Sequence, residues 1–311
     1  MSAPSLGDGP VVLSFDVGGT ATKSAIIDAA GTVTGLRRTP TPRSQTDPAG
    51  AIAERLGVLA EQYRATYPQL APVAAGLSVP GLVDEDAGLG IFSGNLGWRD
   101  APLQALAEAA LHVPVAFGHD VRAAGLAEHR WGAARGHRDA MVIVIGTGIA
   151  STIIVDGVAL VGGGYAGEIG HVVSEPGGEP CPCGGIGCLE TVASAGAIAR
   201  RYREATGRDV DGARGVLEAM GRGDDDARRV WDGAVTALAH EIARAVTVLA
   251  PGIVVVGGGL AEAGDALFTP LRERIGGILS FQRVPDLVPA VLGEDAGLIG
   301  TALRARRRIG A

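Results

Sequence analysis

The feature that most constrains the fold of this chain is a plan of segments that occurs twice. Residues 11–31 read VVLSFDVGGTATKSAIIDAAG, which is an apolar stretch, a glycine turn and a second largely apolar stretch. Residues 141–157, MVIVIGTGIASTIIVDG, repeat this plan with a shorter glycine turn. Each copy predicts a β-hairpin with small residues at its bend. The repeat favours two similar domains that each offer a glycine turn to a shared cleft, with chance similarity between two hairpins as the alternative.

Strand and helix patterns alternate around the two hairpins, which is typical of an α/β protein. Residues 47–63 predict a helix with Asp47 as its N-cap. A long amphipathic helix over 224–250 leads into the apolar strand and glycine turn IVVVGGG at 253–259. Residues 294–310 also predict a helix, and we expect its four arginines to lie in a solvated C-terminal turn.

Composition and charge argue against several classes of partner. Hydrophobic residues make up 47% of the 311 residues and charged residues 20%, as in a globular protein. The net charge of −7 argues against nucleic acid, whose phosphates bind basic surfaces. The first ten residues lack the basic end and the apolar run of a signal peptide, and no apolar stretch approaches the length of a membrane span. We therefore expect a cytoplasmic protein with no nucleic-acid or membrane partner.

Three glycine turns each follow an apolar strand: DVGGT at 16–20, GTG at 146–148 and GGG at 257–259. Small residues at a strand end let main-chain N–H groups approach phosphate oxygens, where a larger side chain would collide. None of the turns matches the Walker pattern or the G-x-G-x-x-G spacing of dinucleotide-binding proteins. The candidate ATP-binding residues are Asp16, Gly18, Gly19, Thr20, Lys23, Gly146, Thr147, Gly148, Gly257, Gly258 and Gly259.

Asp16 differs from its glycine neighbours because its carboxylate would repel ATP unless a cation lay between them. Mg²⁺, bound directly or through water, suits such a position. Thr20 offers a hydroxyl to a phosphate oxygen. The alternative for both residues is a tight turn in which the side chain bonds to its own backbone.

These turns, in this order, resemble those of the sugar kinase, hsp70 and actin fold. The segment CPCGGIGCLE at 181–190, preceded by GEIGH, resembles the ROK family of sugar kinases and repressors more closely, and this resemblance covers essentially the whole chain. It implies an α/β, two-domain actin-like (ribonuclease H-like) ATPase fold with nucleotide and sugar in the interdomain cleft. We expect residues 1–118 plus 298–311 to form the smaller N-terminal domain, and residues 119–297 the larger C-terminal domain. Family members are often dimers or tetramers, so a homo-oligomer is also implied.

All three cysteines of the chain, Cys181, Cys183 and Cys188, lie within eight positions, and His171 precedes the first by ten. One imidazole and three thiolates match a tetrahedral zinc site of the Cys₃His type, and the glycines between them let the chain bend. Three buried thiols around a turn are the alternative. The resemblance implies the same four ligands, and a structural zinc that holds the loop 171–190.

Asp120 directly follows a predicted strand and opens a helix, so its simplest interpretation is an N-cap. The carboxyl end of a strand is also where α/β folds bind ligands. The resemblance implies that Asp120 is the catalytic general base, which accepts the proton of the sugar's primary hydroxyl. It implies a sugar-binding set of Ser78, Gly81, Asn95, His119, Asp120, Glu168, His171 and Glu190. For Asn95 a turn residue is the alternative.

His119 and Arg122 depart from the family pattern, which usually has Asn at both positions. An Asn side chain both donates to and accepts from sugar hydroxyls, whereas a histidine is bulkier and can carry a charge. The two changes put glucose in doubt as the substrate and leave room for an epimer or a modified or amino hexose.

The resemblance implies an ATP-dependent hexose kinase that phosphorylates O6, with Mg²⁺ as cofactor and zinc as a structural ion. A sugar-responsive repressor is disfavoured, because only ten residues precede the first strand and a DNA-binding helix-turn-helix does not fit in them. A catalytically weak sugar sensor is the other alternative, motivated by His119 and Arg122. Such a sensor would bind sugar without turnover of ATP.

Overall fold

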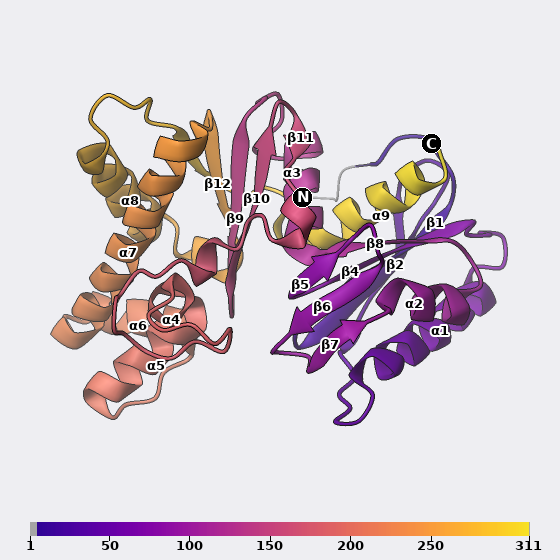
Figure 1. The fold of residues 1–311 in the computed structure, drawn as a ribbon, viewed down its shortest axis with the longest axis horizontal. Coiled ribbons are helices and arrows are strands. Elements are labelled where there is room, and N and C mark those ends of the chain that lie inside the picture. Colours follow the sequence, from indigo (N-terminus) through magenta and orange to yellow (C-terminus); the bar gives the residue numbers. More distant parts are fainter. Residues whose placement is uncertain (1–4, 311) are drawn as a thin grey trace. The chain divides into compact units, whose positions relative to one another are not determined.

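The computed structural model describes residues 5–310, and the chain divides into two compact units. Among the described residues, unit 1 comprises 5–131, the short segment Val161–Ala166 and 294–310. Unit 2 comprises Gly132–Leu160 and Gly167–Gly293. The chain therefore passes between the units four times (Figure 1).

The predicted domain boundaries differ from this division in two main places. Helix α3 (Asp120–Trp131), expected in the second domain, belongs to unit 1 because it packs along α9 (Ala296–Arg308). The segment 161–166 also belongs to unit 1, where a Cβ at Gly164 would lie only 2.0 Å from the carbonyl oxygen of Val83. Unit 1 thus consists of three stretches of chain rather than two.

The main sheet of unit 1 has the strand order β3-β2-β1-β4-β8. On β1, Leu13 and Phe15 face the apolar cluster formed with α1 and α2, whereas Val12 faces Ala302 and Ala305 of α9. This alternation follows from the two-residue period of a strand and places helices on both faces (Figure 1). The further elements are β1 (Val12–Val17), β2 (Ala21–Ile27), β3 (Val33–Pro40), α1 (Pro48–Thr66), β4 (Ala74–Val79), β5 (Leu82–Asp84), β6 (Leu89–Ser93), β7 (Trp98–Ala101), α2 (Leu103–Leu111), β8 (Val115–His119) and η1 (Gly162–Gly164).

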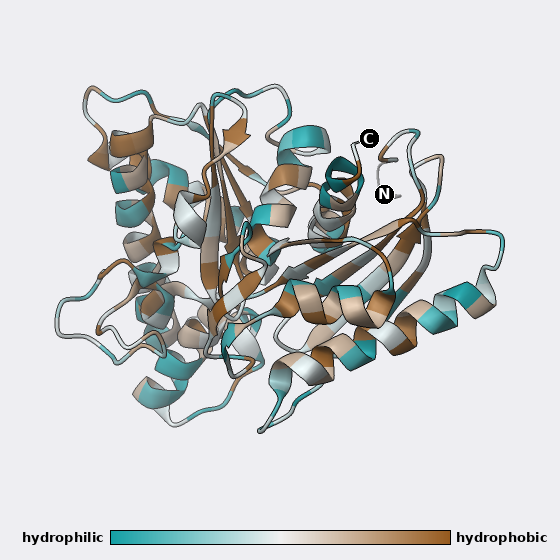
Figure 2. Ribbon diagram, turned by 45° about the vertical axis from the view of Figure 1, so that its right-hand side comes forward, coloured by the Kyte–Doolittle hydropathy of each residue, from teal (hydrophilic) through white to brown (hydrophobic). Residues whose placement is uncertain are grey.

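The sheet of unit 2 has the order β11-β10-β9-β12-β13. Met141, Ile143 and Ile145 of β9 face the largest apolar cluster, which the helices of this unit complete, while Val142 faces a smaller one. Hydrophobic residues lie along the strands of both sheets and also on the helices (Figure 2). The elements are β9 (Ala140–Ile145), β10 (Ile149–Val155), β11 (Val158–Ala159), η2 (Ile169–His171), α4 (Leu189–Ala193), α5 (Ala195–Thr206), α6 (Gly212–Gly221), α7 (Asp225–Leu249), β12 (Ile253–Gly257), η3 (Gly259–Ala263), α8 (Asp265–Ile278) and β13 (Asp286–Pro289); η4 (Gly293–Asp295) leads into α9.

The predicted repeat is confirmed in the topology of the two sheets. Strand β1 pairs antiparallel with β2 and parallel with β4, and β9 pairs in the same way with β10 and β12. In each sheet a further parallel strand, β8 or β13, extends the parallel side. Both copies therefore place a hairpin bend and the carboxyl ends of parallel strands at one edge.

Local signals also fixed the main helix ends. The Asp47 carboxylate accepts a hydrogen bond from the N–H of Gly50 at 2.8 Å, which confirms the predicted N-cap of α1. Asp224 caps α7 in the same manner. The prediction that the four C-terminal arginines lie in a solvated turn is only partly right. Arg306 is 5% exposed and donates hydrogen bonds to the carbonyl oxygens of Gly7 and Pro10. Among the described residues, no helix is both long and apolar enough to cross a membrane.

Candidate active site

In unit 1, three parallel strands bring their carboxyl ends to the same edge of the sheet. The register pairs Asp16 of β1 with Ser78 of β4, and Val79 of β4 with His119 of β8. The predicted residues Asp16, Ser78 and His119 are therefore neighbours across the strand ends, and Asp120 follows directly. This edge is the usual ligand-binding edge of an α/β sheet.

Asp16 is held in place by its neighbours. Ser78 Oγ donates a hydrogen bond to Asp16 Oδ1 at 3.0 Å and lies 2.7 Å from Thr301 Oγ1 of α9. A Cβ at Gly297 would lie 2.5 Å from Asp16 Oδ2, so only glycine lets the first turn of α9 approach the carboxylate. Burial, reinforced by the charge of Asp120, raises the pKa of Asp16 to about 7, although Ser78 and Lys23 oppose this shift.

Asp120 lies where β8 passes directly into α3. Its side chain is 24% exposed, and its Oδ1 accepts a hydrogen bond from the N–H of Val121 at 2.7 Å. The bond typical of an N-cap comes instead from His119, whose Nδ1 accepts from the N–H of Arg122 at 3.3 Å. Burial raises the pKa of Asp120 to about 6, against the Val121 N–H and the charge of Arg122. Such a carboxylate can take up a proton near neutral pH.

The hydrogen bond at His119 also favours one tautomer of its neutral ring. Because Nδ1 accepts the Arg122 N–H, the neutral imidazole carries its proton on Nε2. The side chain is 6% exposed, and Nδ1 is 3.4 Å from Asp120 Oδ1. A ring in this state presents a donor at Nε2.

The first glycine turn contacts the predicted sugar residue Asn95. A Cβ at Gly19 would lie 2.1 Å from Asn95 Nδ2, so the side-chain amide packs directly on the backbone of the turn. Arg43, which the sequence analysis did not identify, donates to the carbonyl oxygens of both Asn95 and Gly19. Glycine is also required at position 81, where φ is +99° and a Cβ would lie 2.4 Å from the carbonyl oxygen of Phe92.

Three predicted ATP-binding residues, Gly18, Thr20 and Lys23, complete this part of unit 1. Gly18 donates its N–H to the carbonyl of Ala21 at 2.9 Å, which closes the bend that also contains the exposed Thr20. Lys23 pairs with Asp16 across the hairpin, and its Nζ lies 3.2 Å from Glu294 Oε2. Lys23 is therefore the basic group closest in register to the Asp16 carboxylate.

Unit 2 brings the other two glycine turns together. The turn with Gly146, Thr147 and Gly148 follows β9, and the turn at 257–259 follows the parallel strand β12 beside it. A Cβ at Gly258 would lie 2.4 Å from the carbonyl oxygen of Ile145, so the second turn lies against the end of β9. Glycine at this position, with φ of +81°, permits both the conformation and the close approach.

Glu190 connects the GTG turn to the cysteine-containing loop. Its Oε2 accepts a hydrogen bond from the N–H of Ile149 at 2.8 Å, and a Cβ at Gly148 would lie 2.6 Å from that oxygen. Glu168 Oε2 lies 3.8 Å from Nε2 of His171. The structure thus places the predicted residues Glu168, His171 and Glu190 around the GTG turn and the loop that follows it.

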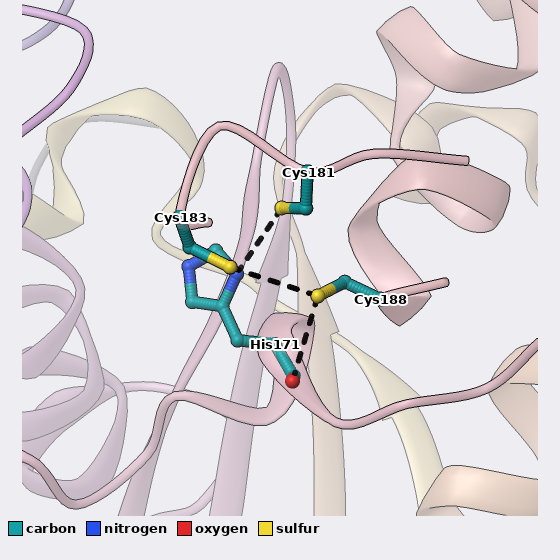
Figure 3. A group of neighbouring side chains, drawn as sticks. All are labelled: His171, Cys181, Cys183 and Cys188. Atoms are coloured by element: carbon teal, nitrogen blue, oxygen red, sulfur yellow. Dashed lines mark hydrogen bonds between the residues drawn. The ribbon is translucent and has the colours of Figure 1, made fainter. Parts of the chain in front are cut away.

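The four predicted zinc ligands converge within unit 2. Their ligand atoms all lie within 4.8 Å of one another, and the side chains point toward a common centre (Figure 3). The sulfurs of Cys183 and Cys188 are 3.7 Å apart, as are Cys181 Sγ and His171 Nδ1. Two thiolates bound tetrahedrally to one zinc at about 2.3 Å lie about 3.8 Å apart, so the donor set fits this ion. Nε2 of His171 points away from the cluster, toward Glu168.

The loop that carries these ligands is also fastened by ion pairs. Arg200 and Arg201, on α5, bind Glu179, and Arg201 donates two further hydrogen bonds to Glu175. Glu175 and Glu179 both precede the first cysteine in the chain. The loop is therefore held to α5 at a point separate from the sulfur cluster.

Comparison with known proteins reports the same resemblance. The family model described as "ROK family" matches residues 12–308. A glucokinase from Thermotoga maritima is 33% identical, over 96% of this chain and 98% of the relative. An N-acetylmannosamine kinase from Escherichia fergusonii is also 33% identical, over 94% of this chain and 98% of the relative.

A solved structure extends the comparison to the fold. A ROK family glucokinase from Streptomyces griseus, in complex with glucose and AMPPNP, superposes with a TM-score of 0.79 at 27% identity, over 96% of this chain and 99% of that chain. The match to the ROK family, the relatives matched over nearly their full length and the similar topology of the two sheets all indicate a two-domain actin-like architecture. The chain therefore belongs to the ROK family.

Proposed function

We propose that this protein is an ATP-dependent hexose kinase that transfers the γ-phosphoryl group to O6 of its sugar. The observation that carries the proposal is Asp120, a partly buried carboxylate at the carboxyl end of β8 with a pKa raised to about 6. His119 supplies the helix-capping bond, so the Asp120 carboxylate is not needed for that bond. The relatives named glucokinase and N-acetylmannosamine kinase support the reaction class.

In the proposed reaction, Asp120 accepts the proton of the 6-hydroxyl as O6 attacks the γ-phosphorus. The O6–P bond forms while the bond from the γ-phosphorus to the bridging oxygen breaks, and ADP leaves with that electron pair. Most of the acceleration comes from alignment of O6 with the phosphoryl group, because phosphoryl transfer requires little covalent participation by the protein.

The ATP phosphates would bind main-chain N–H groups of the glycine turns at 16–20, 146–148 and 257–259. Asp16 and Lys23 would lie at the phosphate end of the first turn. Mg²⁺ suits this position, because the partly buried carboxylates of Asp16 and Asp120 both have raised pKa values, and a divalent cation offsets their charge. When bound, Mg²⁺ supplies positive charge to the phosphate oxygens.

Each unit carries some of the proposed sugar-binding residues. Asn95, Gly81, His119 and Asp120 would contribute from unit 1, with Ser78 behind Asp16. Glu168, His171 and Glu190 would contribute from unit 2, where each carboxylate can accept from two neighbouring hydroxyls. Zinc, held at Nδ1 of His171 and by the three thiolates, would fix the imidazole so that Nε2 faces the substrate.

The identity of the hexose depends most on His119. It carries a donor at Nε2, whereas an Asn would offer both a donor and an acceptor to the ring hydroxyls. The relatives include kinases named for glucose and for N-acetylmannosamine, so an epimer or a modified hexose is within the family's range. We also expect the protein to be cytoplasmic and to form a homo-oligomer. Light scattering of the purified protein would test the oligomeric state.

The test is ATP consumption coupled to detection of the sugar phosphate, across glucose, mannose, allose, fructose, N-acetylated hexosamines and amino sugars. Mg²⁺ and zinc are supplied, and Asp120→Asn is the matched inactive control. Turnover on one hexose with the phosphate at O6 supports the proposal. Sugar binding without turnover on any member of the panel would instead indicate a sensor.

A further inference from the structure

Beside the proposed catalytic base lies a cluster of three charged side chains. Arg122 NH1 donates to Glu85 Oε1 at 2.6 Å, and Arg304 NH2 donates to Glu85 Oε2 at 2.5 Å. The side chains are 4%, 10% and 18% exposed for Arg122, Glu85 and Arg304. Although burial opposes ionisation, Arg304 and Arg122 hold the pKa of Glu85 below its ordinary value. Glu85 therefore stays a carboxylate between two guanidinium groups.

The cluster binds the backbone just before Asp120 and includes Arg122, which lies just after it. Glu85 Oε1 accepts the N–H of His119 at 3.3 Å, and Arg304 donates to the carbonyl of Phe117 at 2.8 Å. Arg122, two residues after Asp120, is the other anchored point. A Cβ at Gly118 would lie 2.7 Å from the guanidinium carbon of Arg304, so the strand end is shaped to receive this side chain.

The same cluster reaches the segment 161–166, which unit 1 contains as a separate stretch of chain. Arg122 NH2 donates to the carbonyl of Gly164 at 3.4 Å. Gly164 has φ of +96° and packs against the backbone of Val83, two residues before Glu85. Arg122 of α3 therefore binds two other parts of unit 1: the residue that follows β5 and this segment.

Buried charges are costly to desolvate, and hydrophobic residues of similar volume often stabilise a fold as well or better. Stability alone therefore does not account for this cluster. The Arg122 guanidinium is bound to Glu85 and Gly164, so it is not available to bind sugar as the family's Asn would be. Its main-chain N–H holds His119 Nδ1, and its side chain holds the surroundings of Asp120.

We propose that Glu85 and Arg122 are positioning residues, which fix the Asp120 turn and the segment 161–166 in the geometry that phosphoryl transfer requires. The proposal rests on the proposed kinase function. Arg122 orders the Asp120 turn through its ion pair with Glu85. Neither side chain touches the reacting atoms, so their effect falls on the rate of the chemical step rather than on binding of either substrate.

The experiment compares Arg122→Met with Arg306→Met, a matched variant that removes a second buried arginine of unit 1. Arg306 binds the carbonyls of Gly7, Pro10 and Asp28, away from the Asp120 turn. We expect Arg122→Met to lower kcat by about 10- to 100-fold, because small displacements of catalytic groups have effects of this size, with both KM values changed by less than about threefold. Arg306→Met lowers the melting temperature and leaves kcat within about twofold of wild type.

Arg122→Lys, which keeps the charge and one donor, restores part of the lost kcat. Amide hydrogen exchange supplies a readout independent of activity: Arg122→Met raises exchange at residues 119–122 and 161–166, and Arg306→Met does not. Equal kcat losses in the two methionine variants, unchanged kcat in Arg122→Met, or unchanged exchange in both segments would each overturn the proposal. If the wild type shows no turnover on the hexose panel, the proposed function fails, and the exchange data still decide whether the cluster fixes the turn.

Discussion

Ser78 Oγ donates a hydrogen bond to Asp16 Oδ1 at 3.0 Å, and this bond joins the ends of two parallel strands. Ser78 is fully buried and also contacts Thr301 of α9. Ser78, a predicted sugar-binding residue, thus holds the carboxylate of Asp16, a predicted ATP-binding residue. The Ser78 hydroxyl therefore couples a predicted sugar-binding residue to a predicted nucleotide-binding residue of unit 1.

Ser78→Ala tests this coupling. Loss of the donor removes an interaction that favours ionised Asp16, so we expect KM for MgATP to rise about fivefold or more, and stability to fall by about 1 kcal/mol. Steady-state kinetics with each substrate varied in turn, together with thermal unfolding, measure the two effects. An increase confined to KM for the sugar would contradict the role in holding Asp16 and would support direct contact with the sugar.

The pH dependence of kcat follows from the raised pKa of Asp120. A general base works only as the carboxylate, so activity should be lost as the pH falls through about 6, by about tenfold per unit below it. Asp120→Asn should lower kcat by about 10²- to 10⁴-fold and leave sugar binding largely intact. A kcat profile that stays flat down to pH 5, or a fully active Asn variant, would show that Asp120 is not the base.

Stability should depend on pH in the direction opposite to that of a salt-bridged carboxylate. Because the pKa values of Asp16 and Asp120 are raised, their protonated forms favour the fold below the ordinary value of 3.8, and this contribution is lost as pH rises through about 6 and about 7. At pH 8 without Mg²⁺, Asp16→Asn should therefore raise the melting temperature by a few degrees while it lowers activity. Asp47→Asn, at an exposed helix cap, is the control and should show no such gain. An Asp16→Asn variant that melts at a lower temperature than wild type would contradict this sign.

Removal of zinc should affect the two substrates unequally. Without the ion, His171 and the cysteines are no longer held by a shared metal. The KM for the sugar should therefore rise at least about tenfold, while the KM for ATP changes little. Hydrogen exchange should increase near 181–188, but less around Glu175 and Glu179, which Arg200 and Arg201 still hold. Cys183→Ser, assayed with zinc present, should reproduce the defect. Unchanged sugar affinity after chelation would argue against the scaffolding role.

The choice of sugar should follow residue 119. His119→Asn restores a side chain with both a donor and an acceptor, and we expect the ratio of kcat/KM for glucose to that for the preferred hexose to rise about tenfold. Because the imidazole also caps α3, thermal unfolding of the same variant separates a change in specificity from a loss of stability. An unaltered sugar preference in a stably folded variant would show that residue 119 does not determine which hexose is phosphorylated.

Features with local causes could be predicted from the sequence. The hairpins follow from apolar strands and glycine bends, and the Asp47 cap from a hydrogen bond to a residue three positions later. The cluster of His171 and three cysteines follows from their closeness in one loop. The Glu85–Arg304 pair joins residues 219 positions apart, and no local pattern marks either partner. The same holds for Arg43, whose two acceptors are brought together only by the folded backbone.

The C-terminal arginines show why such partners escape prediction. A run of arginines at a helix end is usually solvated, yet Arg306 is buried and the Arg304 side chain is only 18% exposed, and each binds other parts of unit 1. The helical period alone does not show that these two positions are buried, because it does not say which face of α9 packs against the protein. That face is set by Val12, Ile27 and Ala74, which lie far away in the chain.

The position of α9 has a consequence for synthesis of the chain on the ribosome. Unit 2 is complete once Gly293 has emerged, whereas unit 1 still lacks the helix that covers Val12, Ile27 and Ala74. Domains usually fold in order from the N-terminus during translation. Here the unit that starts first is finished last, and one apolar face of its sheet lacks the helix that covers it until α9 has been made.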